Sequence, residues 1–106
     1  MQETKPAMTE AVYYILLSLY EPLHGYGIMQ KVEELTAGRV ALAAGTLYGA
    51  LNTLFERGYI KFVAGDDPRK KEYQITKLGK QQLEVELLRL KELVKNGELL
   101  IGGDNR

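Results

Sequence analysis

The sequence predicts a mainly α-helical protein with one small β-hairpin, organised as a winged helix-turn-helix domain followed by a long C-terminal dimerisation helix. Three observations support this fold class. Three segments with helical apolar spacing fill the first half of the 106-residue chain, and two short strand-like segments then flank a polar turn. A helix of about twenty residues follows. We therefore expect a winged domain over residues 1–75 and a dimerisation helix with a polar tail over residues 76–106.

The first two helices are bounded by residues with known capping and stop preferences. Thr9 can cap a helix over about residues 10–19, and Pro22 stops it. A turn over residues 24–27 leads into a second helix, which Gly38 ends in a left-handed conformation. One apolar stripe runs along this second helix and consists of Ile28, Val32 and Leu35.

The third predicted helix separates an apolar face from a polar one. Residues 39–42 alternate as a very short strand would, and the helix then runs from residue 44 to about residue 57, closed by Gly58. Its inward stripe is Leu47, Leu51 and Leu54. At 100° per residue, the opposite face carries Gly45, Gly49, Asn52 and Glu56, flanked by Thr46, Tyr48 and Thr53.

This polar face suits the major groove of DNA, which accepts one helix. The two glycines let the backbone approach closely, and the side chains of Thr46, Asn52 and Thr53 can bond to phosphates or base edges. The hydroxyls of Tyr26 and Tyr48 could reach phosphates while their rings pack on the domain. Taken alone, the same face is equally consistent with a solvent-facing surface, and tyrosines at such places are more often simply half-buried.

The predicted hairpin carries a basic tip. Strands over residues 59–63 and 72–75 flank a polar turn that contains Arg69, Lys70 and Lys71. Beside a recognition helix, these cations would neutralise phosphates and make DNA affinity depend on salt. Three nearby acidic residues offset part of the charge, and most short basic runs are solvated turns. The place of this turn after three helices is what favours DNA.

The composition limits the function classes. Fourteen basic and fourteen acidic residues give zero net charge, which supports an alternative hypothesis, a winged-helix protein-interaction module without a DNA role. There is no cysteine, and the single histidine, His24, has no nearby carboxylate pair, so we expect no metal, cofactor or catalytic site and no enzyme activity. With no long apolar run and no signal-peptide pattern, we expect a cytoplasmic protein that does not enter a membrane.

The C-terminal helix carries a heptad-type seam, formed by Leu83, Leu87, Leu90 and Val94. This seam could pack on its own domain or on a second copy of the chain. Because the first helix is already apolar on most sides, a small domain has little surface left for both, so we expect pairing between copies. A two-fold dimer would read two half-sites of a pseudo-palindromic double-stranded operator, about one helical turn apart.

Four segments together closely resemble the PadR family of transcriptional regulators. They are residues 23–28 (LHGYGI), 45–51 (GTLYGAL), 54–60 (LFERGYI) and 69–79 (RKKEYQITKLG), and the resemblance extends over about residues 9–90. It implies a bacterial or archaeal repressor that dimerises through the C-terminal helix, often acting on its own gene and a neighbouring transporter or stress gene. By matching motif, Tyr26, Thr46, Tyr48 and the basic tip would contact DNA.

The resemblance also implies a small aromatic or drug-like effector, which some family members bind between their subunits. This chain departs from the drug-binding pattern because it has no tryptophan. Its C-terminal part is also shorter than that of members with a longer helical extension. A stacking site for flat drugs is therefore in doubt.

Overall fold

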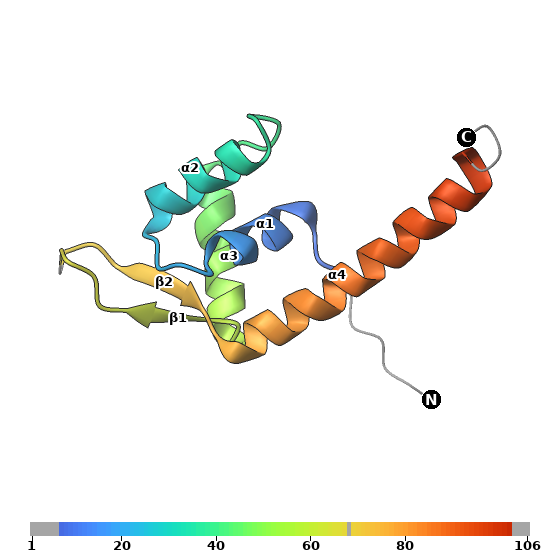
Figure 1. The fold of residues 1–106 in the computed structure, drawn as a ribbon. Helices are drawn as coiled ribbons and strands as arrows, with labels where there is room; N and C mark the ends of the chain where they lie inside the picture. Colours follow the sequence, from blue (N-terminus) through green and yellow to red (C-terminus); the bar gives the residue numbers. More distant parts are fainter. Residues whose placement is uncertain (1–6, 68, 103–106) are drawn as a thin grey trace.

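The computed structural model describes residues 7–67 and 69–102. Figure 1 shows the short helices and the hairpin gathered at one end of the molecule, with the long C-terminal helix leaving them. In chain order the elements are α1 (Glu10–Ser18), α2 (Gly25–Leu35), α3 (Ala44–Glu56), β1 (Ile60–Val63), β2 (Glu72–Ile75), α4 (Lys77–Gly97) and a π-helical turn, η1 (Glu98–Gly102). The predicted winged helix-turn-helix architecture is confirmed.

The predicted helix boundaries follow from capping. The backbone N–H of Val12 donates to Thr9 Oγ1 over 3.1 Å at the start of α1. After α2, Gly38 has φ +82°, the left-handed conformation expected of it. One member of the predicted α2 stripe is wrong: Ile28 and Val32 are fully buried, but Leu35 is 49 % exposed. Leu35 is the last residue of α2, so it extends past the core that the first two turns contact.

The short strand predicted over residues 39–42 is absent from the described residues. The alternation is real, because Val40 and Leu42 pack against the core while Arg39 and Ala41 are exposed. The edge of the hairpin is instead occupied by Leu23, whose N–H donates to Tyr73 O over 3.1 Å and whose carbonyl accepts from Tyr73 N–H over 2.8 Å. The segment before α2 is therefore joined to the edge of the two-stranded wing by a single antiparallel β-bridge.

The antiparallel hairpin is tied to the helices at its base. Its register pairs Ile60 with Ile75 and Phe62 with Tyr73. Both isoleucines are buried, and the N–H of Ile75 donates to the carbonyl of Leu19 over 2.9 Å. The wing is thereby fixed against the end of α1.

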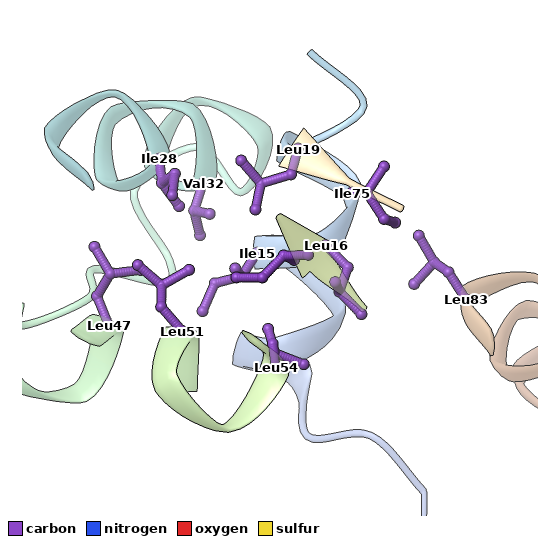
Figure 2. Packing of buried hydrophobic residues seen from close by; sticks show 11 residues of the cluster. Ile15, Leu16, Leu19, Ile28, Val32, Leu47, Leu51, Leu54, Ile75 and Leu83 are labelled. Atoms are coloured by element: carbon purple, nitrogen blue, oxygen red, sulfur yellow. The ribbon is translucent and has the colours of Figure 1, made fainter. Parts of the chain in front are cut away.

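One hydrophobic core joins the four α-helices and the hairpin (Figure 2). Its buried members are Ile15, Leu16, Leu19, Ile28, Val32, Leu47, Leu51, Leu54, Ile60, Ile75 and Leu83. The three leucines predicted to face inward from α3 are among them. Leu83 corrects the predicted seam: it is 3 % exposed in the single chain, so it belongs to the core of the protomer and not to a surface between copies.

The helix α4 begins at the base of the wing and then leaves the domain (Figure 1). Thr76 caps it by accepting the N–H of Gly79 over 3.0 Å, and a side chain at Gly79 would overlap the carbonyl oxygen of Tyr59. The principal extents are 56 × 38 × 21 Å and the radius of gyration is 16.0 Å, against about 13 Å for a compact chain of this length. No helix in the described ranges has the length and apolarity to span a bilayer.

Candidate nucleic-acid interface

The exposed face of α3 gathers the residues predicted to enter the major groove. Gly45, Thr46, Gly49, Asn52 and Thr53 are all exposed. The Thr53 hydroxyl donates to the carbonyl of Gly49 over 3.3 Å, so its oxygen is left to accept a bond from outside. These residues form a polar surface opposite the buried leucines.

The two glycines of this face have open space around them. A Cβ built on Gly45 or on Gly49 would meet nothing within 4 Å. Neither has a positive φ. Nothing inside the protomer therefore requires glycine at these positions, although glycine weakens a helix relative to alanine. A requirement would have to come from a molecule that approaches from outside.

The start of α3 differs from the starts of the other described α-helices. Thr9, His24 and Thr76 each accept a backbone N–H with their side chains at the start of α1, α2 and α4. At the start of α3 the cap residue is Ala43, which makes no side-chain hydrogen bond. The first N–H groups of α3 are thus available to an acceptor such as a phosphate oxygen.

A groove connects this helix to the wing. It has a volume of about 490 Å³ and is lined by His24, Gly25, Tyr26, Tyr48, Arg69, Lys70, Lys71 and Tyr73. Tyr26 is 63 % exposed and Tyr48 is 45 % exposed. The structure therefore brings both predicted tyrosines and all three wing cations (Arg69, Lys70 and Lys71) to one concave surface.

Gly25 positions Tyr48 at the floor of this groove. A Cβ at Gly25 would overlap the Tyr48 hydroxyl, so the ring can lie over the first turn of α2 because position 25 has no side chain. His24 fixes the same turn by accepting the N–H of Gly27 at Nδ1 over 3.1 Å. Sequence reasoning missed both roles, and the adjacency of these residues to Tyr26 was the available signal. Burial raises the pKa of Tyr73, and the neighbouring Tyr48 adds to that shift.

The three wing cations differ in how they are held. Asp67 accepts the backbone N–H of Arg69 over 2.9 Å and its Nε–H over 3.2 Å, and these bonds lower the pKa of Asp67. The Arg69 side chain still remains 89 % exposed. Lys71 Nζ lies 5.1 Å from the centroid of the Phe62 ring, within cation–π range. Pro68, in the predicted polar turn, lies outside the described residues.

Two exposed aromatic rings between α3 and the wing were not predicted as part of the site. The ring centroids of Phe55 and Phe62 are 4.6 Å apart, and those of Phe62 and Tyr73 are 5.2 Å apart. Phe55 lies on the flank of α3 that also carries Tyr48. The three rings form a ladder from α3 to β2, and Lys71 lies over its middle ring, Phe62.

The distal part of the predicted seam is exposed. Leu87 is 40 % exposed, Leu90 is half-buried and Val94 is 58 % exposed, whereas Leu83 is buried. On the same side of α4, Glu86 is buried and accepts Arg89 Nε–H over 3.0 Å, which lowers the pKa of Glu86. The backbone of Met8, just before α1, also lowers the pKa of Glu86, so Glu86 lies where α4 contacts the start of the domain. Sequence reasoning missed this link.

The described residues contain no group of three or more potential metal ligands. His24 is used as a helix cap. The candidate interface thus consists of one polar helix face, one tyrosine-lined groove and one basic wing.

Comparisons with known proteins agree with this geometry. The family model described as "Transcriptional regulator PadR-like family" matches residues 14–85. A transcriptional regulator from Clostridium thermocellum has a similar fold, with a TM-score of 0.72, 22 % identity and coverage of 87 % of this chain and 92 % of its own. A PadR family regulator from Eggerthella lenta gives a TM-score of 0.67 at 27 % identity, covering 85 % of this chain and 80 % of its own.

A third similar structure contains DNA. It is Bacillus subtilis PadR in complex with operator DNA, with a TM-score of 0.63 and 31 % identity. The match covers 78 % of this chain and 49 % of that one, so the chain spans about half the length of the Bacillus protein. A search among curated proteins found no match.

Proposed function

The chain belongs to the PadR-like family of transcriptional regulators, and on this basis we propose that it is a dimeric repressor that binds operator DNA sequence-specifically. Members of this family are transcriptional regulators and not enzymes. The observation that carries the proposal is the continuity of the interface. The open polar face of α3, the groove with Tyr26 and Tyr48, and the wing cations line one side of the domain.

In the proposed complex each part of this surface has a different role. Thr46, Asn52 and Thr53 read base edges in the major groove, while Gly45 and Gly49 allow the helix to approach closely. The two tyrosine hydroxyls and the three wing cations bind phosphates, which fixes the orientation of the domain and adds salt-dependent affinity. In this proposal the three cations beside the groove attract DNA even though the net charge of the whole chain is zero.

The distal seam of α4 supplies the proposed dimer contact. Leu87, Leu90 and Val94 expose apolar surface along one stripe, and covering such side chains contributes about 1.5–3 kcal/mol each. Two copies related by a two-fold axis would read a pseudo-palindromic operator with half-sites about 34–36 Å apart. In this proposal the protein is cytoplasmic and represses its own or a neighbouring transporter or stress gene. A small effector releases it from the operator.

The test is fluorescence anisotropy with the DNA upstream of the protein's own gene and a shuffled duplex of equal length. We expect tighter binding to the upstream DNA and a linear fall of log K with log salt, at a slope of about −0.9 per phosphate contacted. The alternative, a winged-helix protein-interaction module without a DNA role, is favoured by the zero net charge. Equal, weak binding to both duplexes that salt abolishes would support that alternative and refute the repressor.

A further inference from the structure

Two phenylalanine side chains between α3 and the wing are open to solvent. Phe55 is 43 % exposed and Phe62 is 46 % exposed. With Tyr73 they form the aromatic ladder, in which the ring centroids of Phe55 and Phe62 are 4.6 Å apart and those of Phe62 and Tyr73 are 5.2 Å apart. A single exposed apolar residue is common on a protein surface, but adjoining rings form a patch, and such patches are typical of binding surfaces.

The aromatic ladder continues the groove toward the C-terminal end of α3. Tyr73 belongs to both, because it lines the groove and also packs against Phe62. Side chains alternate between the two faces of a strand, so Phe62 lies on the face of β1 that buries Ile60 in the core. This face is turned toward α3, which is in contact with β1 (Figure 1). The two exposed rings therefore lie in the angle between α3 and the wing.

In the proposed DNA complex, one strand of the duplex crosses this angle. With α3 in the major groove and the wing cations on phosphates, the backbone that borders the major groove on the wing side passes between the two. Lys71 Nζ lies 5.1 Å from the centroid of the Phe62 ring. A phosphate bound by Lys71 would therefore bring its own sugar next to the aromatic ladder.

The chemistry of the two exposed rings suits a sugar and not a phosphate. Phe55 and Phe62 have no hydrogen-bonding group, so a phosphate placed on them would lose water without gaining a partner. Deoxyribose is uncharged and lacks the 2′-hydroxyl of RNA, and its C–H groups complement the negative face of an aromatic ring. We propose that Phe55 and Phe62 bind the deoxyribose sugars of the operator strand that lies between α3 and the wing, and that this apolar contact adds affinity that does not depend on salt.

The direct test is hydroxyl-radical footprinting of the operator complex, because these radicals abstract hydrogen atoms from deoxyribose and so report which sugars are covered. The inference rests on the proposed binding of operator DNA, so the parent must first protect sugars in the operator. At saturating protein, Phe55→Gln and Phe62→Thr should each lose protection of a few sugars on one strand of each half-site and keep the rest of the footprint. Phe62→Tyr keeps the ring and should regain that protection.

Fluorescence anisotropy measures the contribution of the contact to affinity. Covering about 40 Å² of apolar surface corresponds to about a five-fold change in Kd, so Phe55→Gln and Phe62→Thr should each raise the operator Kd about five-fold. Phe55→Gln removes no phosphate contact, so the slope of log K against log salt should equal that of the parent. Lys71→Gln should instead flatten this slope by up to about 0.9. Thermal melts and sedimentation establish that each variant is folded and has the oligomeric state of the parent.

Tyr20→Gln is the matched control. Tyr20 is 45 % exposed and has Lys80 Nζ 5.0 Å from its ring centroid, so it repeats an exposed ring with a cation over it, outside the groove lining. This variant should protect and bind the operator like the parent. A full footprint in both Phe55→Gln and Phe62→Thr would overturn the sugar contact. A changed oligomeric state in these variants would also overturn it, because the rings would then contact a second copy of the chain. A parent that protects no sugars would overturn the proposed function, and this inference with it.

Discussion

Gly49 offers the sharpest test of the proposed DNA face, because stability and binding should change in opposite directions. A Cβ at this position meets nothing within 4 Å in the protomer. Alanine in place of glycine inside a helix stabilises a protein by about 0.5–1 kcal/mol. For a domain of this size that corresponds to a rise in Tm of about 2–6 °C. Gly49→Ala should therefore melt at a higher temperature than the parent.

The same methyl group should weaken operator binding. If the α3 backbone lies against base edges, the added carbon pushes the helix outward and lengthens the contacts of its neighbours. The loss of one good base contact is worth about 1–3 kcal/mol, so the operator Kd should rise by about 5- to 150-fold. Thermal melting and fluorescence anisotropy on the same preparation measure the two effects.

Gly97→Ala is the matched control, because Gly97 is also helical, also has open space around its Cβ position, and lies in α4. It should leave the operator Kd unchanged. A Gly49→Ala variant that melts higher and binds the operator as tightly as the parent would refute the assigned face. A lower Tm would instead refute the inference that the space around Gly49 is open.

The other predictions concern the helix face, the wing, the seam and the acid sensitivity of the fold. Asn52→Ala and Thr46→Ala should each weaken operator binding by about 1–3 kcal/mol without lowering Tm, and parent-like anisotropy for both would contradict their role. Neutralising the wing cations should weaken specific and shuffled DNA alike and flatten the salt dependence by up to about 0.9 per lost contact, so an unchanged slope would place the wing away from phosphate. Leu87→Asp with Leu90→Asp should give a folded monomer by sedimentation with greatly reduced operator affinity, whereas a variant that stays dimeric would place the interface elsewhere. Because Arg89 lowers the pKa of Glu86, folding is stabilised above the ordinary value of 4.5 and loses this contribution as pH falls through the lowered pKa, so Glu86→Gln should flatten that part of a stability profile against pH.

Local patterns predicted the elements but not every partner. Capping by Thr9 and the left-handed Gly38 depend on short-range geometry, so the sequence reveals them directly. Leu35 has the spacing of a core residue, yet it lies at the end of α2, where the core is out of reach. The alternation over residues 39–42 is that of a half-buried segment, and no local pattern says that Leu23 occupies the sheet edge instead.

In the candidate site too, local sequence patterns do not show which distant residue a side chain contacts. A heptad stripe buries its residues equally well against the protomer or against a second copy, so spacing could not assign Leu83 to the core. The sequence did predict that Tyr26, Tyr48 and the wing cations lie on one DNA-facing surface, because the order of three helices followed by a hairpin is that of a winged helix-turn-helix domain. In contrast, the overlap that excludes a side chain at Gly25 involves Tyr48, which is distant in sequence, and it became visible only in three dimensions.

The close contact between Gly79 and the carbonyl of Tyr59 has a geometric consequence for a dimer. It lies in the first turn of α4, so it acts as the pivot of a lever whose 21 residues span about 30 Å. A tilt of about 10° at this pivot would move the far end of the lever by about 5 Å, which exceeds the 3.4 Å rise of one base pair. In the proposed dimer, the spacing between half-sites would then be set at the base of α4, far from the proposed contact at Leu87, Leu90 and Val94. Operators of different spacing could be matched by small changes around Gly79, with every residue of the proposed DNA face left as it is.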